Sequence, residues 1–145
     1  MHRFNNNILL SLIMSSLLSL NSYALENKDA LLIRTRAFAG SGHFKEAIAE
    51  LDKIITIDPN DAQIYMMRAF AYNKEGLLDL AIADYSKIIE IEPTNGNAYY
   101  NRGFSYLIKK DYSQSWQDIN KAKFLGIVIN PGILNDLRKG SGRNE

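Results

Sequence analysis

The stretch AQIYMMRAFAYNKEGLLDLAIADYSKIIEIEPTN, residues 62–95, decides the fold because it is one of several similar segments in the chain. Pro59 closes the preceding copy and Pro93 closes this one, 34 residues later. A fixed period of this length predicts a stack of repeated units rather than a single irregular core. The copies begin at Lys28, Ala62 and Gly96.

Each copy is predicted to fold as two helices joined by a turn. Apolar residues recur at spacings of three and four, which is the pattern of a helix with one buried face. Gly42 and Gly76 stand at the predicted turns, where glycine tolerates the positive φ that ends a helix. Lys110 takes that place in the third copy. Because proline cannot continue a helix, Pro59 and Pro93 mark the ends of the first two units.

These residues resemble the tetratricopeptide repeat (TPR), over about Lys28 to Ile127. The eleventh place of each copy is aromatic (Phe38, Tyr72 and Tyr106), and the eighth and twentieth places hold small residues. The resemblance implies an all-α, right-handed solenoid of three helix–turn–helix repeats with a C-terminal capping helix. The repeats would cover residues 28–61, 62–95 and 96–129, with the last one degenerate at its end.

An arginine and a carboxylate recur in every copy at a constant spacing of 16 residues. Such a repeated pair suggests a bidentate, partly buried bond between the two helices of a repeat. A catalytic interpretation would need a cleft and a base at each pair, so we favour a structural role. The pairs are Arg34 with Glu50, Arg68 with Asp84, and Arg102 with Asp118.

Residues 1–24 are predicted to be a secretory signal peptide. Arg3 lies near the start, an apolar run spans Ile8 to Leu20, and small residues precede the expected cleavage after Ala24. The rival is an uncleaved anchor, but the run is shorter than the roughly 20 residues that span a bilayer. We therefore expect an exported bacterial protein, periplasmic or secreted, with a leader at 25–27 and no integral membrane segment after cleavage.

A short helix is predicted to cap the last repeat. Asn130-Pro131 is a typical helix start, and Ile133, Leu134 and Leu137 give it one apolar face. We expect residues 130–139 to cover the exposed apolar end of the solenoid. The rival is a helix that binds a partner. Residues 140–145 are polar and are expected to form a disordered tail.

Composition excludes several classes of function. The formal net charge is +1 and Arg3 is the only charged residue of the predicted signal peptide, so the remainder is formally neutral and carries no footprint for nucleic acid. Cysteine is absent, and His43 is the only histidine after residue 24. A histidine triad or a metal cluster therefore has too few members. We expect no enzyme activity, no catalytic residue, no metal and no cofactor.

The TPR resemblance implies that the first helices line a concave groove that holds a peptide or helix of a partner protein. Some TPR proteins grip a C-terminal carboxylate with two lysines, two asparagines and an arginine. The corresponding places here hold Leu32, Arg36, Met67, Asn97 and Asn101, which disfavours that clamp. The predicted binding residues are Arg36, Met66, Met67, Phe70, Asn73, Tyr100, Asn101, Phe104 and Ile108.

A protein–protein interaction module is thus the predicted function. The alternative is a structural subunit that assembles with itself, as a homo-oligomer, into an envelope complex. Packing of the apolar groove residues among the first helices themselves remains a further possibility at this stage.

Overall fold

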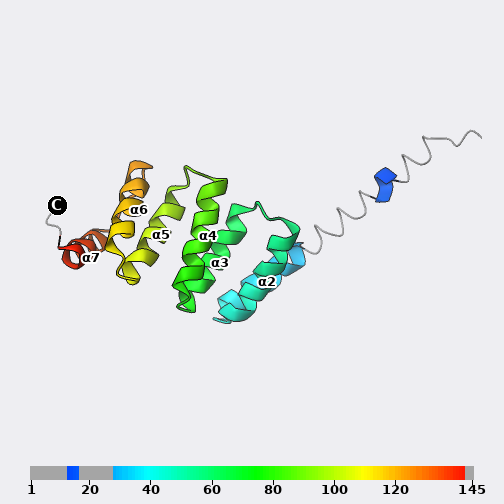
Figure 1. Ribbon diagram of the computed structural model, residues 1–145. Coiled ribbons are helices and arrows are strands. Elements are labelled where there is room, and N and C mark those ends of the chain that lie inside the picture. Colours follow the sequence, from blue (N-terminus) through cyan, green and yellow to red (C-terminus); the bar gives the residue numbers. More distant parts are fainter. Residues whose placement is uncertain (1–12, 17–27, 143–145) are drawn as a thin grey trace, which may run out of the picture.

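The computed structural model describes residues 13–16 and 28–142, and every regular element among them is helical. Residues 28–40 are helical, and the following helices are α2 (Phe44–Ile57), α3 (Ala62–Lys74), α4 (Leu78–Ile91), α5 (Gly96–Ile108), α6 (Tyr112–Phe124) and α7 (Pro131–Ser141). The helices stand side by side in chain order (Figure 1). This is the predicted all-α repeat stack.

Two kinds of contact build the stack. Helices of one repeat pack as pairs, α3 on α4 and α5 on α6, and neighbouring repeats meet where α2 contacts α3 and α4 contacts α5. The packing is closest at the small eighth place. A Cβ on Gly103 would lie only 3.0 Å from the Cβ of Asp118 in α6. Ala69 occupies the same place in α3 and is fully buried.

The turns between paired helices need a left-handed residue, and the chain supplies it in two ways. Gly42 has a φ of 78° and Gly76 a φ of 74°. Lys110, at the same place in the third repeat, has a φ of 63°. Its amide donates to the carbonyl of Leu107, as the glycine amides donate to the carbonyls three residues earlier. The third turn therefore keeps the geometry of the others with an unfavourable residue.

Side-chain caps fix where the first helices begin. The carboxylate of Asp61 accepts from the amide of Gln63 at 3.0 Å, and the amide oxygen of Asn95 accepts from the amide of Ala98 at 3.0 Å. Each cap satisfies an amide that has no partner within its helix. The links between successive repeats thus each contain a proline turn, and the helix that follows the turn begins at a side-chain cap.

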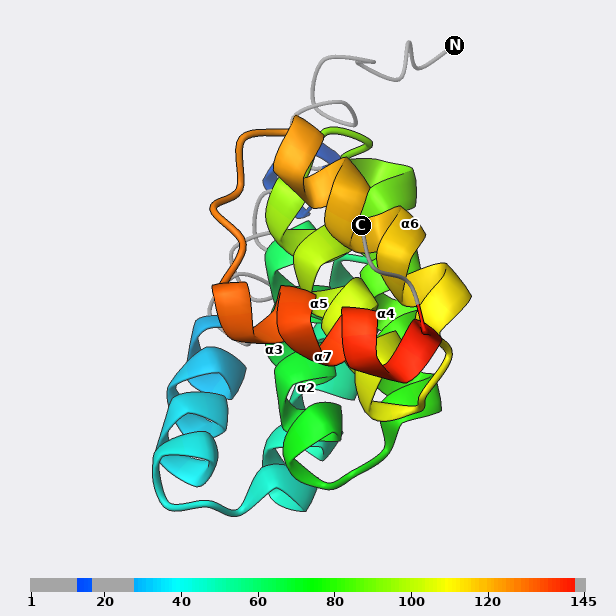
Figure 2. The same ribbon diagram turned by 90° about the vertical axis from the view of Figure 1, so that its left-hand side faces the viewer.

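Helix α7 covers the end of the last repeat, as Figure 2 shows from that side of the stack. Ile133 and Leu137 are buried in a cluster with Ile119 and Ala122 of α6. The indole N–H of Trp116 donates to the hydroxyl of Ser141 at 3.1 Å and holds the far end of the helix. The last repeat therefore does not present a bare apolar edge.

The predicted end of this helix was two residues too early. Gly140 and Ser141 were expected in the disordered tail, but α7 continues through Ser141. It stops because Gly142 adopts a left-handed φ of 67°. The contact between Ser141 and Trp116 accounts for the extra half turn.

Some predictions fall outside the described residues. The signal peptide and the leader lie in residues 1–27, of which only 13–16 are described, and residues 143–145 of the tail are not described either. These assignments stay predictions. Among the described helices, none is long and apolar enough to cross a membrane.

Candidate functional site

A cavity of about 640 Å³ opens between the three first helices. Thr35 and Ala39 contribute from the helix at 28–40, six residues contribute from α3, and Asn101, Phe104 and Ile108 contribute from α5. The second helices supply the remaining walls. The cavity thus lies where the repeat pattern predicts a concave groove, and it is lined mainly by apolar side chains.

Seven of the nine predicted binding residues line this cavity. They come from two helices only, because α3 and α5 turn the same apolar face toward the space between them. The seven are Met66, Met67, Phe70, Asn73, Asn101, Phe104 and Ile108.

Arg36 and Tyr100 do not line the cavity. Thr35 and Ala39 sit one helical turn apart on the face that does, and Arg36 lies one position further round the helix, where it is exposed. Tyr100 is partly buried in the cluster that holds α7. Tyr100 packs there because the capping helix, which the repeat pattern does not include, contacts its cluster. A part in binding for either side chain stays a prediction.

The mouth of the cavity carries exposed aromatic and aliphatic side chains. Phe70 is 52% exposed, Phe104 39% and Ile108 50%. The ammonium of Lys74 lies 5.2 Å from the ring centroid of Phe70. Phe70 also makes an edge contact with Phe44 of α2, at a centroid distance of 6.2 Å. The rim is therefore apolar with one cation at its edge.

Asn73 is already engaged and is not free to bind a ligand in this arrangement. Its amide N–H donates to the hydroxyl of Tyr85 at 2.9 Å, and its carbonyl oxygen accepts from the hydroxyl of Ser105 at 3.2 Å. Burial raises the pKa of Tyr85 to about 12. Asn101 differs, because among the described residues its side chain makes one polar contact, a long 3.7 Å approach of its amide nitrogen to the sulfur of Met66. Asn101 is thus the amide that remains available to a peptide backbone.

Sequence reasoning missed the walls that the second helices supply. Ala47 and Leu51 of α2 and Tyr85 of α4 line the cavity although they are almost fully buried. They occupy small and large apolar places of the repeat, which the sequence assigns to the core. The hydroxyl of Tyr85 was the available signal, since a buried phenol needs a polar partner nearby.

The three arginine–carboxylate pairs lie between the helices of each repeat, away from the cavity. Arg68 donates through Nε and Nη2 to the two oxygens of Asp84 at 2.8 and 2.7 Å, and Arg102 does the same to Asp118 at 2.7 and 2.8 Å. Hydrogen bonds to Asp84 raise the pKa of Arg68 above its ordinary value. No pair opens into the cavity, so a structural role remains our interpretation.

Arg34 and Glu50 form a looser pair. Nε and Nη2 of Arg34 both donate to one oxygen of Glu50, at 3.2 and 2.8 Å, and Lys53 takes the other oxygen at 3.0 Å. The hydrogen bond from Arg34 is the main cause that lowers the pKa of Glu50. Over the described residues, no group of three or more histidine, cysteine, aspartate or glutamate side chains could hold a metal ion.

Comparison with known proteins identifies the repeat. Residues 69–108 match the family model described as TPR repeat. This part of the chain is a tetratricopeptide repeat. Among curated protein sequences, nothing matches the chain.

Solved TPR domains share the fold across most of the chain. The yeast Sti1 TPR2B domain, in a complex with an Hsp70 peptide, is 22% identical with a TM-score of 0.68 and covers 82% of this chain and 99% of its own. The second TPR domain of human RPAP3, in complex with the HSP70 peptide SGPTIEEVD, is 21% identical with a TM-score of 0.70, covering 81% and 98%. The Arabidopsis OM64 TPR domain is 19% identical with a TM-score of 0.70, covering 82% and 98%.

Proposed function

We propose that this TPR protein is a non-catalytic interaction module that holds an apolar segment of a partner protein in the cavity between its first helices. The cavity carries the proposal, because its volume and its exposed rim of Phe70, Phe104 and Ile108 suit side chains of a bound peptide. Methionine and aromatic residues are typical of adaptable binding surfaces. The structures of TPR domains with bound peptides support the same use of the fold.

The chemistry of the ligand differs from that of an acidic C-terminal tail. None of the residues that line the cavity is acidic, and Lys74 is the only charged one. None of the five places that correspond to the carboxylate clamp holds a lysine. We therefore propose a ligand with two or three apolar anchors and at most one carboxylate, placed near Lys74. Asn101 supplies the polar contact that we first assigned to several side chains.

Export completes the proposal. The predicted signal peptide would direct the protein to the bacterial periplasm or the exterior, where its partner would be found. The alternative function is self-assembly through an end of the solenoid or through the groove. At the C-terminal end this assembly has little apolar surface to use. Ile133 and Leu137, on which it would depend, are 8% and 0% exposed.

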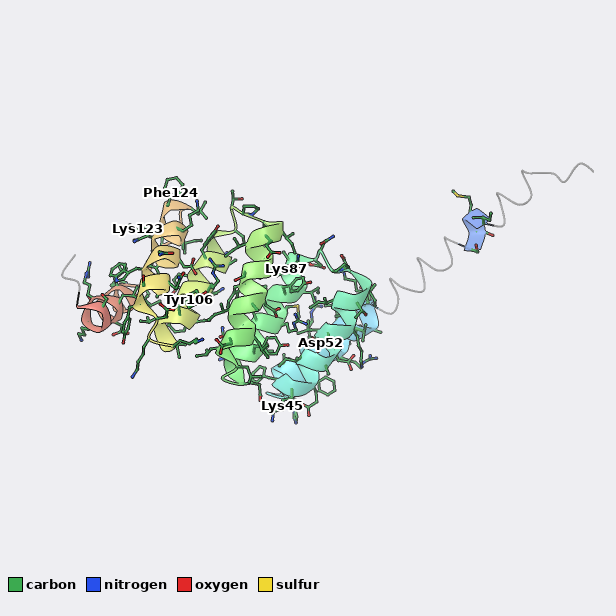
Figure 3. All side chains as sticks on the ribbon, in the orientation of Figure 1. Lys45, Asp52, Lys87, Tyr106, Lys123 and Phe124 are labelled. Atoms are coloured by element: carbon green, nitrogen blue, oxygen red, sulfur yellow. The ribbon has the colours of Figure 1, made fainter. Side chains whose placement is uncertain are left out.

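The test is selection of peptides from a display library on residues 25–145, followed by calorimetry. The double variant Phe70→Glu/Phe104→Glu should lose the selected peptides by more than about a hundredfold in Kd, because each buried aromatic is worth roughly 1.5–3 kcal/mol. Phe124→Glu is the matched control. Phe124 is 81% exposed and points away from the helices at the end of α6 (Figure 3).

Circular dichroism must show that the double variant is folded. Peptides that bind the double variant as well as the parent, or that are lost with Phe124→Glu alone, would refute the cavity as the site. Selected peptides without apolar anchors would refute the proposed ligand chemistry.

A further inference from the structure

The arginines of the second and third repeats also bond to the repeat before each of them. Nη1 of Arg68 donates to the carboxylate of Asp52 in α2 at 2.6 Å, and Nη1 of Arg102 donates to the hydroxyl of Ser86 in α4 at 2.9 Å. Figure 3 labels Asp52 on α2. Each guanidinium thus joins three helices: its own, its partner in the repeat, and the second helix of the preceding repeat.

Arg34 lacks this third bond. Its Nε and Nη2 reach Glu50, but no described residue accepts from its Nη1. Its side chain is 50% exposed, whereas those of Arg68 and Arg102 are 18% and 20% exposed. In the first repeat, Nη1 of Arg34 therefore has no acceptor among the described residues. The equivalent nitrogens of the second and third repeats bond to the preceding helix.

The apolar neighbours of Arg34 are uncovered in the same way. In α3 the third and tenth places are Ile64 and Ala71, each 2% exposed where α2 packs on them. In the helix at 28–40 no described element covers the corresponding face, and Ile33 is 66% exposed. We call this the outer face. It consists of Ala30, Ile33, Arg34 and Ala37.

The interface between α2 and α3 shows what chemistry fits the outer face. Helix α2 presents the carboxylate of Asp52 one turn before Ile55, which packs against the clusters on both sides of the interface. No described residue accepts from Nη1 of Arg34, so a carboxylate on the incoming helix would complement it as Asp52 complements Nη1 of Arg68. The occupant is an amphipathic helix with an acidic residue beside its apolar stripe.

Among the described helices of a second copy of this chain, none is free to supply that helix. The faces of α2 and α4 that would fit are covered by α3 and α5, and α7 closes the end of α6. We infer that the outer face binds an acidic amphipathic helix of another protein, which takes the position that a preceding second helix would take. This surface is separate from the cavity, because none of its four residues lines it.

The experiment uses a peptide with the sequence of α2, FKEAIAELDKIITI, acetylated and amidated, as a probe of that chemistry. It is titrated into the isotope-labelled protein, expressed from its complete coding sequence, and followed by amide shifts in NMR spectra. We expect saturable shifts centred on residues 30–37. The same peptide with asparagine in place of Asp52 should bind about tenfold more weakly, because the bond to Arg34 loses its charge.

Two protein variants give the controls. Ile33→Glu should abolish the shifts without affecting the fold, because Ile33 is a surface side chain, and Ala37→Glu provides an independent second break. Phe70→Glu/Phe104→Glu should bind the peptide as the parent does, which separates this surface from the cavity. Shifts confined to cavity residues, shifts retained in both outer-face variants, or no shifts at the solubility limit of the peptide would each overturn the inference.

Discussion

Replacing Arg68 by alanine should destabilise the fold far more than replacing Arg34, although both occupy the same place of the repeat. Arg68→Ala removes three charge-assisted hydrogen bonds and leaves Asp84, whose side chain is 6% exposed, without its partner. Asp52 is half exposed and can return to water at little cost. Stranding a buried charge costs about 3–5 kcal/mol, so Asp84 carries most of the loss.

The matched variant Arg34→Ala should cost about 1 kcal/mol or less. Arg34 is half exposed, and Glu50 keeps Lys53 as a partner at 3.0 Å. Urea unfolding followed by far-UV circular dichroism measures both, and equal slopes with denaturant confirm that the midpoints can be compared. Removing Asp84 as well, in Arg68→Met/Asp84→Leu, should recover much of the lost stability.

Two results would refute this reasoning. Equal losses in Arg68→Ala and Arg34→Ala would show that burial and the bond to the preceding repeat contribute nothing. A double variant no more stable than Arg68→Ala would show that the unpaired carboxylate is not the source of the cost.

Three further predictions concern single positions. Lys110→Gly should stabilise the fold by about 1 kcal/mol in urea unfolding, because it removes a left-handed lysine, while Lys110→Ala should not. In alkaline unfolding, the parent protein should lose about 2–3 kcal/mol of its free energy of unfolding between pH 10 and 12, and Tyr85→Phe should not show this loss. Burial raises the pKa of Tyr85 to about 12, so the folded state keeps a proton that the unfolded state releases as the pH rises. Gly103→Ala should cost about 1–3 kcal/mol in the same urea assay, because the new Cβ would lie 3.1 Å from Ile119, whereas Gly40→Ala meets no atom within 4 Å and should cost nothing.

Each of these has a contradicting outcome. Equal stability of the glycine and alanine variants at Lys110 would mean that its positive φ carries no strain. An unchanged alkaline transition in Tyr85→Phe would place the titrating group elsewhere. A neutral Gly103→Ala would show that α5 and α6 can separate freely.

The repeat could be predicted from the sequence because its signals are periodic and independent of one another. The 34-residue spacing, the small places and the proline ends all point to the same helix pairs, and Arg68 and Asp84 lie in contact as their spacing suggested. The bond from Arg68 to Asp52 was also available, since it repeats the 16-residue spacing in the opposite direction. The sequence pattern considered only carboxylates that follow each arginine, so the bond to the preceding Asp52 was not predicted.

The cavity was harder to predict because its details depend on side-chain neighbours from other elements. Tyr100 occupies a groove place but packs with the cluster under α7, whose position no repeat pattern specifies. Asn73 occupies another, yet it bonds to Tyr85 and Ser105 from different helices. The placement of a helix face could thus be inferred from period alone, whereas the availability of each polar group could not.

The two ends of the stack differ in how firmly their terminal helices are held, so local unfolding should start at one end. At one end Trp116 holds the terminal helix through Ser141, and at the other Arg34 has one donor idle. Local opening should therefore begin at the helix formed by residues 28–40 and travel toward α6, since among the described helices only those on one side of it pack against it. In hydrogen–deuterium exchange the amides of this helix should lose protection first and those around Ile119 last. The stack should therefore unfold progressively from its N-terminal end toward the end that α7 covers.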